Sequence, residues 1–146
     1  MSLTIPQVVA DAARRFPFEG LVDRDGDRVI RWTFAELAQH VTDVTRAFLG
    51  AGIAPGDRIA IWAPNSHEWI LAALGAQGAG GVVVPLNTRF KGAEAAYVLG
   101  KSGARMLFCV NGFLGNDYVA ALATEDVPTL ETVVVMRGSV PADATP

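Results

Sequence analysis

The chain has 146 residues, a length that suits one ordinary domain with a core that needs neither disulfides nor metals. Hydrophobic residues make up 51% and charged residues 18%, which excludes the composition of a disordered chain. The net charge is −3 and the basic residues are scattered, so we expect no nucleic-acid partner. The apolar runs are too interrupted for a membrane helix and the N-terminus lacks a secretory pattern, so we expect no transmembrane segment and a cytoplasmic location.

The first part of the chain predicts a helix followed by a β-hairpin. Apolar residues at helical spacing begin at Ile5, and Pro17 ends that pattern. The dipeptide Asp25-Gly26 then separates two β-prone runs, 21–24 and 28–32, and it favours a tight hairpin turn.

A second helix is predicted by its boundary residues. Thr33 and Glu36 have the spacing of a capping box, in which hydroxyl and carboxylate accept from N–H groups at a helix start. An apolar stripe follows, and Gly52 is a natural left-handed residue for the helix end.

The next segment predicts a β-α-β unit with parallel strands. A strand is expected at 58–62, a largely buried helix at 66–77 and a second strand at 81–86. Asn65 and Glu68 have the spacing of a helix start, so Asn65 is the expected N-cap.

The C-terminal half continues the alternation of helices and strands. We expect a helix at 91–102, a strand at 105–110, a short helix near 117–122 and a last strand at 131–136. This order predicts an α/β fold, a mostly parallel sheet with flanking helices, in addition to the N-terminal hairpin. Residues 1–137 are then the folded part, and residues 138–146 a linker or disordered end.

Two glycine-containing stretches imitate phosphate-binding loops. Gly75 to Gly81 follows a helix and enters a strand, whereas a dinucleotide loop must follow a strand and open a helix. Ala95 to Ser102 ends like a Walker A motif but lacks its first glycine and is helical in character. These contexts disfavour a nicotinamide-dependent dehydrogenase.

The sequence offers little for catalysis or metal binding. A nucleophile-elbow motif and a metalloprotease motif are both absent. His67 and Glu68 are neighbours, so on a helix they should point in different directions and form no pair. Cys109 is expected to be a small apolar residue inside a strand, so no metal site and no catalytic residue are predicted.

The stretch "GGVVVPLNTRFKGAE", residues 80–94, carries the candidate binding residues. Pro85 stops strand pairing, so Asn87, Arg89 and Lys91 follow the C-terminal edge of a parallel strand, where open α/β sheets bind ligands. An arginine there can bind a phosphate or carboxylate through two N–H groups. The alternative is a solvated loop with ordinary surface charges.

Three pieces of sequence carry a family resemblance: "WTFAEL", "GDRIAIWAPNSHEWILAALGAQGAGGVVVPLNTRF" and "AYVLGKSGARMLF", in this order. Together they resemble the N-terminal part of an acyl-CoA synthetase, a fatty-acid-CoA ligase of the adenylate-forming (AMP-binding) superfamily. The resemblance covers nearly the whole chain. In finer detail it is closest to actinobacterial fatty-acyl-CoA synthetases, including those acting on steroid-derived acids.

The resemblance implies ATP-dependent formation of an acyl-adenylate, assisted by Mg²⁺, and then of a thioester with CoA. The family's Ser/Thr/Gly-rich phosphate loop, its later nucleotide contacts and its C-terminal lysine have no counterpart in the chain. We therefore expect an N-terminal fragment that alone is inactive and binds none of these cofactors tightly. The carboxylic-acid substrate, fatty or steroid-derived, would bind to the missing part.

The resemblance also assigns a role to one residue. In some aryl-CoA ligases of the family, an arginine in an "LNPR" setting contacts a CoA phosphate, and Arg89 in "LNTR" matches it. Thr88 replaces the usual proline, and a purely structural loop arginine stays the alternative. A different class of function is a truncated interaction or regulatory module, which would expose apolar patches and self-associate. Whether the chain forms a homo-oligomer stays open.

Overall fold

The computed structural model describes residues 3–140, which fall into two compact units. The first unit consists of residues 3–56 together with Asn65–Val82, and the second of Asp57–Pro64 together with residues 83–140. Each unit has a hydrophobic cluster of its own. The domain boundary expected at residue 137 stays a prediction, and most of the expected linker lies outside the described residues.

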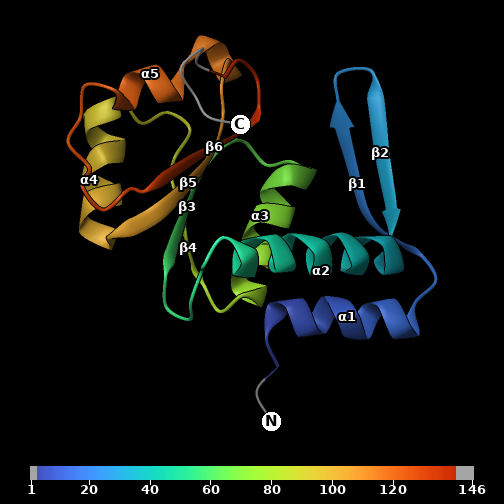
Figure 1. Ribbon diagram of the computed structural model, residues 1–146. Helices are drawn as coiled ribbons and strands as arrows, with labels where there is room; N and C mark the ends of the chain where they lie inside the picture. Colours follow the sequence, from blue (N-terminus) through green and yellow to red (C-terminus); the bar gives the residue numbers. More distant parts are fainter. Residues whose placement is uncertain (1–2, 141–146) are drawn as a thin grey trace. The chain divides into compact units, whose positions relative to one another are not determined.

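Helices and strands alternate along most of the chain (Figure 1). In chain order the elements are α1 (Ile5–Arg15), β1 (Glu19–Asp25), β2 (Arg28–Thr33), α2 (Phe34–Gly50), β3 (Arg58–Trp62), α3 (His67–Gly78), β4 (Val82–Pro85), α4 (Gly92–Ser102), β5 (Ala104–Val110), the 3₁₀ turn η1 (Phe113–Gly115), α5 (Tyr118–Leu122) and β6 (Thr132–Arg137). Strands β1 and β2 form an antiparallel hairpin, and a four-stranded sheet has the order β4-β3-β5-β6. The expected α/β fold, with a parallel sheet, flanking helices and an N-terminal hairpin, is confirmed.

Helix α2 begins and ends as its sequence predicts. The Thr33 hydroxyl accepts from the N–H of Glu36, and the Glu36 carboxylate accepts from the N–H of Thr33. At the other end, Gly52 has a φ of 78°, and its N–H donates to the carbonyl of Leu49. The left-handed conformation there favours glycine, because it has no Cβ to clash.

The hairpin turn lies one residue later than the sequence indicated. Asp25 pairs with Arg28 across the hairpin, so Gly26 and Asp27 are the two turn residues. Gly26 has a φ of 59°, which suits a tight hairpin turn. The hairpin packs on α2 and α3 around one hydrophobic cluster, whose buried members are Leu21, Ile30, Leu37, Val41 and Leu74.

The prediction of Asn65 as the N-cap of α3 is wrong. Ser66 is the N-cap, and its hydroxyl accepts from the N–H of Trp69 at 3.3 Å. The helix begins at His67, so the residue directly before it, Ser66, is the N-cap. An N-cap side chain accepts from the N–H two or three positions later, here that of Trp69, which has no partner within the helix.

The glycines at the end of α3 allow close packing against α2. A Cβ at Gly75 would lie 2.5 Å from Cγ1 of Val44, and one at Gly78 would lie 2.3 Å from Oγ1 of Thr45. Side chains at these positions would therefore force the two helices apart. This stretch leads from helix to strand, as expected, and its glycines also serve helix packing.

The second unit is built on the four-stranded sheet. Strands β3, β5 and β6 are paired in parallel, and β4 lies at the edge beside β3. Helices α4 and α5 pack on one face of this sheet, where alternate residues of β3 and β5 point toward them. The buried members of this cluster are Ala60, Trp62, Leu86, Ala95, Leu99, Ala104, Leu107, Cys109 and Tyr118. Among the described residues, no helix is long and apolar enough to cross a membrane.

Candidate functional site

Two polar regions of the structure could take part in function. The first, here called the Asp23 cluster, consists of Asp23, His67 and Glu68 in the first unit. The second, here called the Arg89 loop, is the segment 86–91 between β4 and α4 in the second unit.

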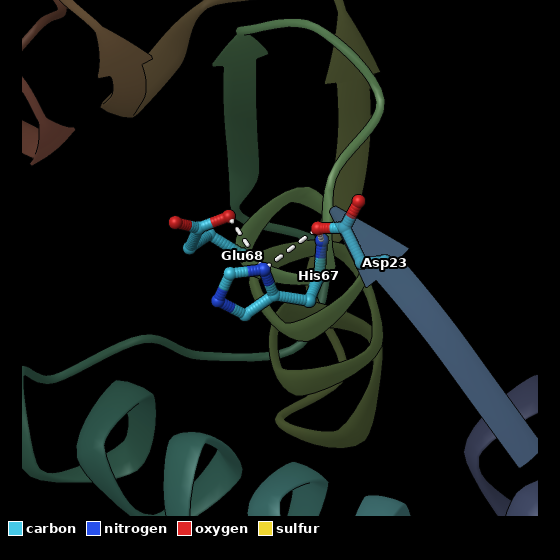
Figure 2. Close-up of side chains that lie close together, drawn as sticks. All are labelled: Asp23, His67 and Glu68. Atoms are coloured by element: carbon cyan, nitrogen blue, oxygen red, sulfur yellow. Dashed lines mark hydrogen bonds and ion pairs between the residues drawn. The ribbon is translucent and has the colours of Figure 1, made fainter. Parts of the chain in front are cut away.

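The Asp23 cluster joins the hairpin to the start of α3 (Figure 2). One carboxylate oxygen of Asp23 accepts from the backbone N–H of His67 and lies 2.8 Å from Nδ1 of its ring. On the other side of this nitrogen, Oε2 of Glu68 lies 3.1 Å from Nδ1. Two carboxylates therefore flank one ring nitrogen at a helix N-terminus.

The expectation that His67 and Glu68 form no pair is therefore wrong. His67 and Glu68 are the first two residues of α3, and side chains on a helix lean toward its N-terminus. At the first turn there is no preceding turn to separate the two side chains. The cluster was also missed because Asp23 lies 44 positions from His67, and no local spacing signals the contact.

The cluster fits a structural role better than a metal site. Its three ligand atoms lie within 4.8 Å of one another, which is close enough for a cation. However, the positive end of the α3 dipole lies there and favours anions. The pKa of Asp23 is also informative: burial acts to raise it, but hydrogen bonds from the His67 ring, the His67 N–H and the Arg24 N–H outweigh burial and lower it. Asp23 is thus held as an anion beside the N-terminus of α3, where it accepts from the first helical N–H.

The Arg89 loop presents an exposed cation. Oδ1 of Asn87 accepts from the N–H of Arg89 at 2.9 Å, and the carbonyl of Asn87 accepts from the N–H of Phe90 at 3.0 Å. The loop thus closes on itself as an Asx turn, with Asn87 at its start. The Arg89 side chain is exposed, and within residues 3–140 it has no ion pair with an acidic group.

Two aromatic side chains hold the loop backbone. Nε1 of Trp62 donates to the carbonyl of Asn87 at 3.0 Å, and the hydroxyl of Tyr118 donates to the carbonyl of Thr88 at 2.9 Å. The Trp62 and Tyr118 rings stack on each other with centroids 4.1 Å apart. Two side-chain hydrogen bonds therefore support the turn around Thr88.

The three polar residues predicted at this edge have different roles. Asn87 shapes the turn, and Lys91 is the N-cap position of α4, where its N–H donates to the Glu94 carboxylate at 2.8 Å. The Arg89 side chain is exposed and has no ion pair among the described residues, and its planar guanidinium can bind an anion through two N–H groups. It is the residue of this edge best suited to bind an anion.

Two other residues with reactive side chains, Cys109 and His40, are packed against neighbouring residues. Cys109 is fully buried in β5, and burial raises the pKa of its thiol to about 12. The ring of His40 contacts the ring of Trp32, with centroids 4.3 Å apart and the planes tilted by 40°. A groove of about 490 Å³, lined by α1, α2 and the end of α3, has no carboxylate, histidine or cysteine in its lining. None of these places offers a nucleophile with an adjacent base.

Comparison with known proteins gives the family of the chain. Residues 9–145 match the family model described as AMP-binding enzyme. A 7a-methyl-1,5-dioxo-octahydro-1H-inden-4-yl propanoyl:CoA ligase of Rhodococcus jostii (strain RHA1) is 38% identical over 139 residues, which cover 92% of this chain and 26% of that protein. The medium-chain acyl-CoA ligase ACSF2, mitochondrial, of Homo sapiens is 31% identical over 156 residues, covering 96% of this chain and 25% of that protein.

A solved structure is similar over the same region. The N-terminal domain of FACL13 from Mycobacterium tuberculosis superposes with a TM-score of 0.81 and 26% identity, covering 92% of this chain and 34% of that one. The chain spans about a quarter of the length of the curated relatives it matches. With the family model matching most of its residues, the chain belongs to the AMP-binding enzyme family.

Proposed function

We propose that this chain is the N-terminal part of an ATP-dependent carboxylic-acid:CoA ligase. The observation that carries the proposal is the match of residues 9–145 to the family, together with relatives that are CoA ligases. In such an enzyme the carboxylate attacks the α-phosphate of ATP and pyrophosphate leaves, which gives an acyl-adenylate. The CoA thiol then attacks the acyl carbon, and AMP leaves. Neither of the two stretches that imitate phosphate-binding loops, Gly75 to Gly81 and Ala95 to Ser102, leads from a strand into a helix, so we expect ATP and Mg²⁺ to be held by other parts of the enzyme.

The contribution of this segment would be to bind CoA. Arg89 follows the C-terminal edge of a parallel sheet, its side chain is exposed, and the backbone of its loop accepts hydrogen bonds from Trp62 and Tyr118. A guanidinium in that setting suits a phosphate of the CoA nucleotide. A solvated loop arginine without a ligand is the alternative that the experiment below distinguishes.

The acid would be a fatty acid or a compact, ring-containing propanoate. Relatives whose names specify a methyl-dioxo-octahydroindenyl propanoyl group are 38% identical, whereas the medium-chain acyl-CoA ligases are 31% identical or less. We favour the ring-containing acid on this difference. For location we propose the cytoplasm, and the mitochondrion named for ACSF2 is the alternative for a fractionation experiment.

The ligase proposal is tested by pyrophosphate exchange. The full-length protein that contains this segment should exchange labelled pyrophosphate into ATP only when a suitable carboxylic acid is present. A panel should contain ring-bearing propanoates and fatty acids of different lengths. Failure of every acid, or a stop codon directly after Pro146 in the gene, would refute the ligase and favour a non-catalytic interaction module.

The role of Arg89 is tested in the same full-length protein. Arg89→Ala should raise the apparent KM for CoA about tenfold or more, because a charge-assisted contact to phosphate is lost. Acid-dependent pyrophosphate exchange should be unchanged, since it precedes CoA binding. Arg24→Ala, an equal change of charge at an exposed position on the hairpin, is the control. An unchanged KM for CoA would show that Arg89 is a solvated loop arginine that does not contact CoA.

A further inference from the structure

Two consecutive backbone carbonyls of the Arg89 loop accept hydrogen bonds from a stacked aromatic pair, Trp62 and Tyr118. Trp62 ends β3 and donates to Asn87, and Tyr118 begins α5 and donates to Thr88. We propose that Trp62 and Tyr118 are positioning residues that fix the Arg89 loop, and through it the arginine, for an anionic ligand. The inference rests on the proposed CoA contact. It adds Trp62 and Tyr118, which are 56 positions apart in the sequence, to the site of Arg89.

Burial makes these two hydrogen bonds specific. Trp62 is 0% exposed and Tyr118 is 1% exposed, so neither polar atom can exchange its protein partner for water at low cost. Each ring is also fixed by the other, because they are stacked nearly in parallel at 18°. The direction of each N–H or O–H group is therefore set by the packed rings.

Further contacts fix the position of Tyr118 itself. Asn111 is buried, and its Oδ1 accepts from the N–H groups of Tyr118 and Val119 at the start of α5. Nδ2 of the same side chain donates to the carbonyl of Ser139 at 2.9 Å. Burial, with a smaller contribution from Cys109, raises the pKa of Tyr118, so its hydroxyl keeps its proton at neutral pH and remains a donor.

The residues that Trp62 and Tyr118 hold are directly adjacent to Arg89 or hydrogen-bonded to it. Thr88 is the residue directly before Arg89, and the N–H of Arg89 is bound by the side chain of Asn87, the other anchored residue. With both preceding carbonyls fixed, the Arg89 backbone has little freedom to move. An arginine on a fixed backbone loses less conformational entropy when it binds an anion.

The alternative is that Trp62 and Tyr118 only fill the core. Tyr118→Phe separates the two roles, because it removes the hydroxyl and retains the stacked ring. Tyr97→Phe is a matched control, since the Tyr97 hydroxyl accepts from Lys101 on the exposed surface of α4 in the same unit. Trp62→Phe is a second variant that removes the other donor while keeping an aromatic ring.

The measurement is the CoA dependence of thioester formation by the full-length protein. Tyr118→Phe should raise the apparent KM for CoA about threefold to tenfold, the range expected for one neutral hydrogen bond. Acid-dependent pyrophosphate exchange should be unchanged, and Tyr97→Phe should alter neither quantity. Adding Arg89→Ala to Tyr118→Phe should give no further rise beyond that of Arg89→Ala alone, because both variants act through one side chain.

Hydrogen exchange gives a second readout that needs no activity. In Tyr118→Phe, the amides of Arg89 and Phe90 should exchange faster than in the wild type, while amides of β5 should keep their protection. If Arg89→Ala raises the KM and Tyr118→Phe changes neither the KM nor the exchange, the positioning role is refuted and the CoA contact stands. If Arg89→Ala leaves the KM unchanged, the CoA contact fails, and unchanged exchange in Tyr118→Phe would then refute positioning as well.

Discussion

The Asp23 cluster and the Arg89 loop use charge in opposite ways. In the cluster, Asp23 and Glu68 both face the ring of His67, so the charges are used within the first unit to join β1 to α3. In the loop, the backbone is held by neutral donors, and the exposed Arg89 side chain has no ion pair among the described residues. The difference shows why a dense polar cluster can be structural while a single exposed cation on a fixed backbone is the better candidate for binding.

The largest effect is expected from removing the anchor of the Arg89 loop. Trp62→Ala should lower the free energy of unfolding by about 3–5 kcal/mol, because a fully buried indole is lost and a cavity remains. Chemical denaturation measures this loss. Trp32→Ala, at a partly buried position in the first unit, should cost less; an equal loss would contradict the view that the second unit depends on its aromatic anchor.

The contact between α4 and α5 should be the next most sensitive. A Cβ at Gly92 would lie 2.1 Å from the carbonyl oxygen of Ala121, so Gly92→Ala should destabilise by about 1–3 kcal/mol. Gly100→Ala is the control on the same helix, because no atom lies within 4 Å of its added Cβ. That variant should stabilise by about 0.5–1 kcal/mol through helix propensity. Equal effects of the two changes would show that α5, and with it Tyr118, does not pack closely on Gly92.

The Asp23 cluster should affect stability by a smaller amount. Asp23→Ala should cost about 1–2 kcal/mol, because the N–H and ring of His67 lose their acceptor at the start of α3. Asp27→Ala, at an exposed position in the hairpin turn, should change the unfolding free energy by less than about 0.5 kcal/mol. Similar values for both variants would show that the cluster has no structural role.

The same cluster predicts a dependence of stability on acid. The pKa of Asp23 is lower in the folded chain than its ordinary value of 3.8, so the folded state favours the ionised form. Its contribution is therefore complete above pH 3.8 and is lost as the pH falls through the folded-state pKa. Denaturation at a series of acidic pH values should show a shallower decline in Asp23→Asn than in the wild type, and parallel declines would contradict the assignment.

The smallest effect on stability is expected at Arg89. Arg89→Ala should change the free energy of unfolding by less than about 0.5 kcal/mol, because the side chain is exposed and has no ion pair in the described chain. Its N–H contact to Asn87 is retained in alanine. A thermal denaturation scan is sufficient for this comparison. A loss as large as that of Asp23→Ala would place Arg89 among the structural residues and weaken the contrast between the two regions.

The sequence predicted the elements well where local chemistry determines them. The capping box at Thr33 and the left-handed Gly52 placed the ends of α2, and the strand at 58–62 was predicted with its observed bounds. Local signals were less reliable where two residues could serve equally well. Asn65 and Ser66 can both cap a helix, and only the observed start of α3 at His67 decides between them.

The candidate site was predicted in part. The position of Pro85 at the end of β4 and of Arg89 beyond it followed from the apolar run and the proline. The sequence could not show that Trp62 and Tyr118 hold the intervening carbonyls, because both look like ordinary core residues. The Asp23 cluster was missed because Asp23 lies on β1, whereas His67 and Glu68 lie on α3.

By itself, the sequence determined the α/β alternation, the ends of α2 and the family, because hydrophobic periodicity, capping and motif order are local properties of the chain. The tertiary structure decided which polar side chains meet. Asp23 reaches the start of α3, and Tyr118 reaches the carbonyl of Thr88, only because separate elements pack together. Such contacts depend on packing between distant segments, and no spacing within one segment encodes them.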